Sequence, residues 1–187
     1  MRPRQAFEAT ALPHLADLYA VAMRFTRNPD DARDLVQETF LRAYTAWASF
    51  EPGSNCRAWL IRILTNSFIN HYRRGRSHKA FRGRGEEEQA TVLYGAGFRR
   101  EERDPETQIV DEQLGDEVSA ALAELPADYR VVVVLADLED MKYKDIAGAL
   151  GCPIGTVMSR LFRARRMLEE RLSGYAREGY GILRAAG

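Results

Sequence analysis

Residues 143–168 read YKDIAGALGCPIGTVMSRLFRARRML, and this stretch constrains the fold more than any other. The spacing of its apolar residues predicts a short helix at its start and a longer helix that ends at about residue 168. The Gly-Cys-Pro tripeptide at residues 151–153 would form a tight turn between them. A helix, a glycine-containing turn and a second helix make up the helix-turn-helix motif. The inner face of the short helix would carry Ile146, Ala147 and Leu150.

The second helix of this motif is predicted to expose an unusual set of side chains. A narrow arc of apolar residues, which includes Val157 and Leu161, would pack inward and leave the opposite side to solvent. On that side a phenylalanine stands among arginines, although an exposed phenylalanine has no structural purpose. Because arginine can pair with guanine or phosphate and phenylalanine can contact a thymine methyl group, this face suits the major groove of DNA. The outward residues are Met158, Ser159, Phe162, Arg163 and Arg166.

A second informative stretch, residues 57–74, reads RAWLIRILTNSFINHYRR. At about 100° per residue, Leu60, Leu64 and Phe68 gather on one side of a predicted helix, as core residues should. The opposite side carries amides and guanidinium groups, with an aromatic ring at its edge. Arginine contacts phosphate, an asparagine amide can read a base edge, and an aromatic ring can stack on an unpaired base. This side is therefore either a surface for single-stranded DNA or an idle solvated face. It consists of Trp59, Arg62, Asn66, Asn70 and Arg73.

The stretch NPDDARDLVQETFLRAYTAWASF, residues 28–50, predicts a third helix with a mixed outer face. Asn28 and Pro29, followed by two aspartates, form a helix start. The core side is expected to carry Val36, Phe40, Ala43 and Trp47. The remaining surface mixes acids, an amide and leucines, which fits either an ordinary amphipathic helix or a docking face for another protein. The residues of that surface are Asp34, Leu35, Gln37, Glu38 and Leu41.

The bulk composition indicates a soluble globular protein. The chain has 187 residues, of which 45% are hydrophobic and 29% are charged. No apolar run approaches the roughly 20 residues of a membrane span, and no signal peptide is visible, so we expect a cytoplasmic protein without membrane insertion. Cys56 and Cys152 lie far apart, which favours a reducing compartment over a disulfide framework.

The charge is balanced overall but unevenly distributed. The 27 basic and 27 acidic residues cancel, yet residues 53–85 contain basic residues and no acidic one. A second basic cluster lies at residues 160–166, and two such patches indicate a nucleic-acid partner. The sequence has no glycine-rich phosphate loop, no metal-ligand cluster and no nucleophile–base pairing. We therefore expect no enzyme, no cofactor and no metal site.

The alternation of helical patterns and breaks predicts an all-α protein. Two small helical domains would be joined by a flexible linker, with the first domain at residues 5–80, the linker at 81–108 and the second domain at 109–178. The β-branched run Val131–Val134 favours a strand by propensity. The helical spacing of the residues around it predicts a helix instead.

Taken in order, the three stretches resemble bacterial RNA polymerase sigma factors of the extracytoplasmic-function (ECF) group, within the sigma-70 family. DLVQETFLRAY resembles the helix by which these sigma factors dock on the clamp helices of the polymerase β′ subunit. FEPGSNCRAWLIRILTNSFINHYRR resembles their −10 promoter segment, and YKDIAGALGCPIGTVMSRLFRARRML resembles their −35-reading helix-turn-helix. The resemblance implies sigma region 2 and sigma region 4 on either side of a linker. It also implies a promoter-specificity subunit whose partners are promoter DNA and RNA polymerase core, through the β′ clamp helices and the β flap.

The resemblance implies roles for individual residues. The polymerase-binding residues would be Asp34, Leu35, Gln37, Glu38 and Leu41. The −10 DNA-binding residues would be Ser54, Asn55, Trp59, Arg62, Asn66, Asn70, Arg73 and Arg74, and Asn66 would help to read an unpaired base. The −35 DNA-binding residues would be Thr156, Met158, Ser159, Arg160, Phe162, Arg163 and Arg166.

AWLIRILTNSFINHYRR and MLEERLSGYAREGYG are similar to one branch of the group, which answers thiol-oxidative stress. That resemblance implies an anti-sigma factor as a regulatory partner, zinc-binding and redox-sensing. The main alternative is a dimeric helix-turn-helix transcriptional regulator that acts without being a polymerase subunit. Such a protein would bind a palindromic site as a symmetric dimer. It would leave the amide and arginine stripe at residues 62–73 unexplained.

Overall fold

The computed structural model describes residues 3–82 and 115–180, and every regular element in these two ranges is a helix. The predicted all-α class is confirmed. The predicted linker falls almost entirely outside the described residues, so its bounds and those of the two domains stay predictions. The first range contains α1 (Pro3–Ala11), η1 (Leu12–His14), α2 (Leu15–Thr26), α3 (Pro29–Thr45), η2 (Trp47–Ser49) and α4 (Cys56–Arg82). The second contains α7 (Asp116–Glu124), α8 (Ala127–Val133), the π-helical segment η3 (Val134–Leu138), α9 (Tyr143–Leu150) and α10 (Ile154–Tyr180).

The start of α3 follows directly from its sequence. The Asn28 side chain accepts hydrogen bonds from the backbone N–H groups of Asp30 and Asp31, at 2.9 and 3.1 Å. Pro29 occupies the first turn, where the missing N–H costs nothing. The two aspartates lie at the positive end of the helix macrodipole. The helix start predicted at Asn28 is therefore confirmed.

In the N-terminal half, α4 supplies the centre of the core. Leu60, Leu64 and Phe68 are buried on one side of this helix, as the sequence predicted. The Phe68 ring packs on Phe25 of α2, with 5.2 Å between ring centroids. Because α4 also packs against α1 and α3, its buried face meets three other helices and is held in one orientation.

Replacing Phe68 with alanine is expected to lower the free energy of unfolding by about 3–5 kcal/mol, the usual cost of a cavity left by a fully buried phenylalanine. Phe68 is only 1% exposed. Urea unfolding followed by circular dichroism measures the loss. The exposed Asn70, half a turn away, is the matched control: Asn70→Ala should change stability by about 0.5 kcal/mol or less. Equal losses for the two variants would contradict the assigned orientation of α4.

The core of the C-terminal half is built around the β-branched run at residues 131–134. Val131, Val132 and Val134 are fully buried, and α8 and η3 keep the whole run helical, as predicted from its neighbours. Ile146 of α9 and Leu161 of α10 complete this core. Tertiary packing overrides the strand propensity of valine here, because α8 packs against α10 on one side and α2 on another, while η3 packs against α9 and α2.

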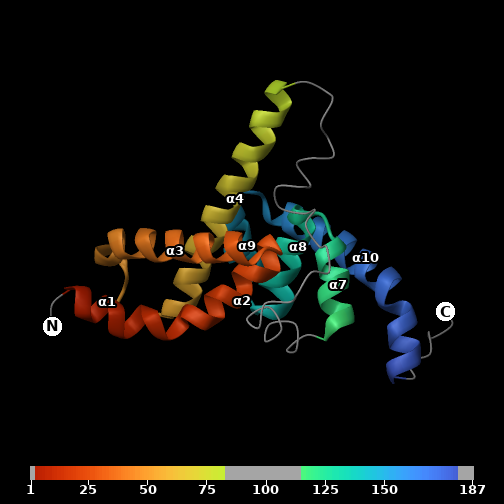
Figure 1. Cartoon of the computed structure of the whole chain (residues 1–187), viewed down its shortest axis with the longest axis horizontal. Coiled ribbons are helices and arrows are strands. Elements are labelled where there is room, and N and C mark those ends of the chain that lie inside the picture. The colour runs from red at the N-terminus through yellow and green to blue at the C-terminus, as the bar shows by residue number, and fades with distance from the viewer. Residues whose placement is uncertain (1–2, 83–114, 181–187) are drawn as a thin grey trace.

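The two halves lie side by side (Figure 1). The helices coloured red to yellow contact those coloured green to blue along two seams, where α2 meets α7 and α8 and where α4 meets α9. The buried apolar residues of both halves form one contiguous cluster. The helix that carries the predicted −10 surface therefore touches the first helix of the helix-turn-helix.

Candidate nucleic-acid interface

The helix-turn-helix is present where the sequence predicted it. Gly151 ends α9 in the left-handed conformation, with φ at 59°, and its N–H donates to the carbonyl of Ala147. Glycine suits this position because a side chain would be strained there. Cys152 donates its N–H to the same carbonyl at 3.1 Å, and Pro153 leads into α10. This turn fixes the angle at which α10 leaves α9.

The outer face of α10 carries the expected side chains. Phe162 is 71% exposed and Met158 is 54% exposed, while Val157, Leu161 and Ala164 are buried on the other side. Ser159, Arg163 and Arg166 are exposed as well. The large apolar side chains on this face, set among arginines, form a surface suited to bind a partner. Their outward orientation, predicted from the sequence, is confirmed.

Two of the predicted −35 residues are less accessible than the others. Arg160 is half-buried, and its guanidinium group lies 3.5 Å from the carboxylate of Asp128 in α8. Thr156 is also half-buried, and its backbone carbonyl accepts a hydrogen bond from the Ser159 hydroxyl at 3.0 Å. A base contact by Arg160 would therefore break an ion pair first. Both assignments stay predictions.

Replacing Phe162 with alanine is expected to leave stability within about 0.5 kcal/mol of the native value, because the side chain packs on little of the protein. The expected loss is in the affinity of polymerase holoenzyme for promoter duplex, by about 5- to 30-fold, if the ring contacts a thymine methyl group. Filter binding measures this loss. Leu168→Ala on the inner side is the contrasting variant, since it should lower stability instead. Unchanged promoter affinity for Phe162→Ala would contradict the assignment.

The predicted −10 stripe of α4 faces away from the core. Arg62, Asn70 and Arg74 are exposed, and Asn66 and Trp59 are half-buried. The Trp59 ring packs on Phe50 with 5.0 Å between centroids, so it is fixed at the edge of the stripe. The predicted division of this helix into a core side and an amide side is confirmed in its geometry.

One member of the stripe already has a partner in the other half. The guanidinium group of Arg73 donates a hydrogen bond of 2.8 Å to the carbonyl oxygen of Leu150, at the C-terminal end of α9. The negative end of a helix macrodipole favours a cation there. Arg73 is therefore engaged by the C-terminal half in this conformation.

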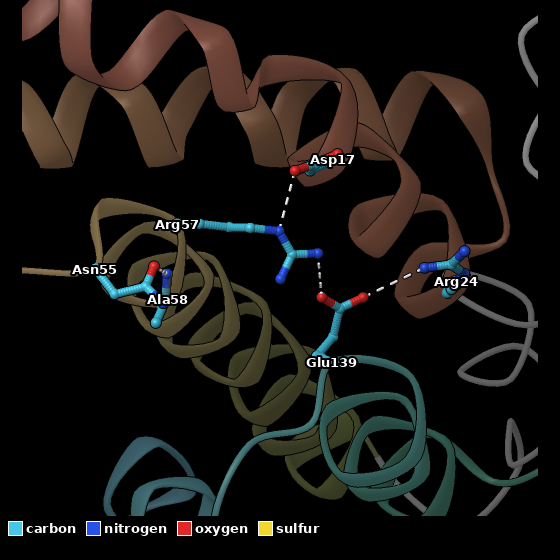
Figure 2. Close-up of polar contacts among 6 residues, drawn as sticks. All are labelled: Asp17, Arg24, Asn55, Arg57, Ala58 and Glu139. Atoms are coloured by element: carbon cyan, nitrogen blue, oxygen red, sulfur yellow. Dashed lines mark hydrogen bonds and ion pairs between the residues drawn. The ribbon is translucent and has the colours of Figure 1, made fainter.

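The loop before α4 owes its shape to two residues that were predicted to contact DNA. The Ser54 hydroxyl donates to the carbonyl of Glu51 at 2.7 Å and closes a turn around Gly53, whose φ is 87°. The Asn55 side chain accepts a hydrogen bond from the Ala58 N–H at 3.0 Å and caps α4 (Figure 2). Both residues are exposed. They fix the turn and the start of α4 at the end of the stripe.

The predicted docking face of α3 is mostly exposed. Leu41 is 63% exposed beside the exposed Tyr44, and Asp34 and Gln37 are exposed too. Glu38 is half-buried between Arg42 at 2.6 Å and His71 of α4 at 3.0 Å. An apolar spot bordered by paired charges is typical of a protein-binding surface.

The prediction that Leu35 lies on this outer face is wrong. Leu35 is 3% exposed and belongs to the core. The physical reason is that α2 and α4 both pack on α3, so the buried arc is wider than a single stripe. Ala32 and Thr39, one turn before and after Leu35, are also fully buried and mark this second row. Leu35 therefore supports the docking helix from inside.

A partly buried polar cluster between the halves was not predicted (Figure 2). The Glu139 carboxylate accepts from Arg57 at 2.6 Å and from Arg24 at 3.3 Å, and Arg57 also contacts Asp17 at 3.0 Å. The Glu139 side chain is 1% exposed. Burial raises the pKa of Glu139, and the attraction of Arg57 and Arg24 opposes that effect. The sequence showed Arg57 only as a member of a basic cluster, because its partner lies in the other half of the chain.

A second contact between the halves involves two arginines. Arg27 of the N-terminal half and Arg130 of α8 both donate to the carbonyl of Ala123, near the C-terminal end of α7. Arg130 is 2% exposed, and burial, together with the nearby charge of Arg27, lowers its pKa to about 9. The end of α7 thus joins the two halves through its backbone.

Within residues 3–82 and 115–180, no helix is both long and apolar enough to cross a membrane. Cys56 is buried and Cys152 is half-buried, and neither forms a disulfide.

Family models match both halves of the chain. The model of Sigma-70 region 2 matches residues 11–78, and the model of Sigma-70, region 4 matches residues 115–168. The RNA polymerase sigma-H factor of Pseudomonas aeruginosa is 31% identical over 94% of this chain and 90% of its own length. The ECF RNA polymerase sigma factor EcfG of Rhodopseudomonas palustris is 36% identical over 91% of this chain and 87% of its own. The ECF RNA polymerase sigma factor SigE of Mycolicibacterium smegmatis is 37% identical, and this chain spans 61% of its length.

Two solved structures share the fold. The sigma factor RpoE, in complex with the anti-sigma factor NepR from Bartonella quintana, has a TM-score of 0.63 and 33% identity, covering 90% of this chain and 98% of that one. CnrH, in complex with the cytosolic domain of CnrY, has a TM-score of 0.58 and 27% identity, covering 91% and 90%. Both halves and their order thus define a sigma-70 family protein. Within that family, the chain belongs to the ECF group of RNA polymerase sigma factors.

Proposed function

We propose that this chain is a promoter-specificity subunit that directs RNA polymerase core to its promoters and starts transcription there. The observation that carries the proposal is that one chain of this family exposes three separate surfaces: the apolar spot at Leu41, the amide stripe of α4 and the arginine–phenylalanine face of α10. A dimeric helix-turn-helix regulator would use only the last of them. The protein acts in the cytoplasm and catalyses no reaction itself.

The work is divided between the halves. The face of α10 around Phe162 binds the −35 duplex in the major groove, by direct readout. The stripe of α4 then holds the separated −10 strand, and Asn66 reads an unstacked base. Trapping that base offsets the few kcal/mol needed to unstack it, which favours melting at the correct sequence. Leu41 and its polar neighbours hold the chain on the β′ clamp helices, and the C-terminal half meets the β flap.

A regulatory partner follows from the relatives. RpoE was solved in complex with the anti-sigma factor NepR, and CnrH was solved in complex with the cytosolic domain of CnrY. We extend this mode of control to the present chain: an anti-sigma factor covers the surfaces that polymerase needs. The similarity to the thiol-oxidative-stress branch stays a prediction, and so does a zinc-binding, redox-sensing partner. None of the relatives described above is named for a response to thiol-oxidative stress.

DNA binding should depend on polymerase core. The net charge of the chain is zero, and neutralising phosphates supplies much of the affinity of DNA-binding proteins. A mobility-shift experiment on genomic fragments of the source bacterium, at physiological salt, tests this. A discrete complex is expected for the chain plus core. Tight binding of the chain alone to a palindromic duplex, as a symmetric dimer, would favour the regulator instead.

A further inference from the structure

One polar contact between the halves is built around a single acidic residue. Glu139 follows η3, where its N–H donates to the carbonyl of Val134 at 3.0 Å and ends the π-helical segment. The next residue, Asp140, has a φ of 50°, in the left-handed region that non-glycine residues seldom adopt. This turn aims the Glu139 carboxylate at the N-terminal half, where Arg24 of α2 and Arg57 of α4 reach it from two helices (Figure 2).

Two further polar contacts join the halves, one at each seam. Arg27 donates to the carbonyl of Ala123 at the end of α7, and Arg73 donates to the carbonyl of Leu150 at the end of α9. In each case an arginine of the N-terminal half meets the negative end of a helix of the C-terminal half. Four arginines of one half therefore find their acceptors in the other.

This closed arrangement cannot serve both promoter elements at once. The positions of the −10 and −35 elements differ by about 25 base pairs, which is roughly 85 Å along a DNA strand. In the structure α4, which carries the stripe for the −10 strand, is in contact with α9 of the helix-turn-helix. Arg73, predicted to hold the −10 strand, is also occupied. The halves must therefore separate before a promoter is bound.

We propose that Glu139 is a latch that holds the free chain closed by bridging Arg24 and Arg57, and that this latch opens when the chain joins polymerase. The proposal rests on the proposed function for the need to open. The closed state itself is a property of the free chain and can be tested without polymerase.

The energetics suit a latch that opens. Removing these charges from water cancels most of what their attraction returns, so the bridge favours the closed state by a small margin only. Burial raises the pKa of Glu139 and lowers that of Arg24 despite their attraction for each other. The Nε group of Arg24 is also buried without a hydrogen-bond partner in the described part of the chain. The ionic part of the contact therefore opposes opening only weakly, whereas removing Glu139 leaves the buried Arg24 without its carboxylate partner.

Single-molecule energy transfer on the full-length chain tests the latch. Dyes are attached to A16C on α2 and K144C on α9, two exposed positions, in a chain that also carries C152S. The native Cys56 is buried, and burial raises the pKa of its thiol, so it reacts slowly with the dyes. The free chain is expected to show one main population with high transfer efficiency, which corresponds to the closed state.

Charge-reversal variants distinguish the loss of the Glu139 latch from a general effect of net charge on the closed-to-open ratio. E139K places a cation against two arginines and should lower the closed-to-open ratio at least tenfold, and R57A should lower it because Glu139 loses its nearest partner. The double variant E139K/R57E restores one opposite pair but leaves Arg24 against the new lysine and places the new glutamate beside Asp17, so it should recover part of the closed population lost in E139K. A misfolded turn would recover none of it. E8K makes the same charge change in the exposed Arg4–Glu8 pair and should leave the ratio unchanged. Equal ratios for the native chain and E139K would overturn the proposal.

Adding core polymerase to the labelled chain tests the latch and the proposed function separately. If both hold, core shifts the native chain to low transfer efficiency, and E139K is open before core is added. If the chain joins core and supports transcription while the halves stay at high transfer efficiency, the latch is wrong and the proposed function stands. If core has no effect and no complex forms, although E139K opens the free chain, the closing contact stands and the proposed function fails.

Discussion

Replacing Leu41 with glutamate is expected to reduce the affinity of the chain for RNA polymerase core at least 30-fold, which corresponds to about 2 kcal/mol, the usual threshold of an interface hot spot. Leu41 projects from α3 with most of its side chain in solvent, next to the exposed Tyr44. A carboxylate at this place would be desolvated without a partner whenever the surface is covered. Fluorescence anisotropy of the labelled chain, titrated with core, measures the affinity.

A second exposed leucine provides the control for this experiment. Leu12, on η1, is 49% exposed and lies outside the docking face, so L12E introduces the same charge into the same half. We expect L12E to bind core like the native chain and to transcribe normally. If L41E keeps native affinity, or if L12E loses as much as L41E, the docking surface is not where we place it.

Replacing Asn66 with alanine is expected to lower promoter-dependent transcription by about 5- to 150-fold, the range that corresponds to the loss of one good base-reading contact of 1–3 kcal/mol. The amide lies on the outer stripe of α4, away from Leu64 and Phe68, so the fold should not change. Binding to core should stay native, because Leu41 is untouched. Transcription by holoenzymes reconstituted with native or N66A chains measures the effect.

The choice of promoter sequence gives a sharper result for the same variant. A residue that reads one base should, when removed, relax the preference at that base and leave the others unchanged. Selection from a promoter library randomised across the −10 element is therefore expected to show the loss of preference at one position. Preferences retained at every position, or a loss of core binding that matches the loss of transcription, would remove Asn66 from base reading.

The local parts of the fold could be predicted from the sequence because each depends on one helix. The inner face of α10 at Val157 and Leu161, and that of α4 at Leu60 and Leu64, follow from apolar spacing alone. The turn at Gly151 follows from the conformational freedom of glycine. In each case the residues that determine the geometry are close together along the chain.

The parts that could not be predicted depend on several helices at once. Leu35 lies one turn from Ala32 and Thr39, and its burial depends on the second helix that packs on α3, which a wheel for one helix cannot show. Glu139 lies 82 positions after Arg57 and 115 positions after Arg24 in the sequence. Nothing in the local pattern links an acid in one half to two arginines in the other, so this cluster is visible only in three dimensions.

The closed structure leaves one predicted DNA surface accessible and occupies part of the other. The face of α10 at Phe162 is open to solvent, whereas Arg73 on α4 is occupied by the end of α9. The predicted −35 surface is thus accessible in the closed chain, whereas the predicted −10 surface is not complete. In the mechanism we propose, polymerase binding separates the halves and frees Arg73 for the melted strand.

The most direct test of the central claim is run-off transcription on fragmented genomic DNA of the source bacterium, with sequencing of the RNA 5′ ends. Reactions contain core polymerase alone, core with the native chain, or core with L41E. We expect a discrete set of start sites that needs the native chain, shares a −35 and a −10 element, and is lost with L41E. If adding the native chain to core yields no new start sites, although the two proteins form a complex, the chain is not a promoter-specificity subunit.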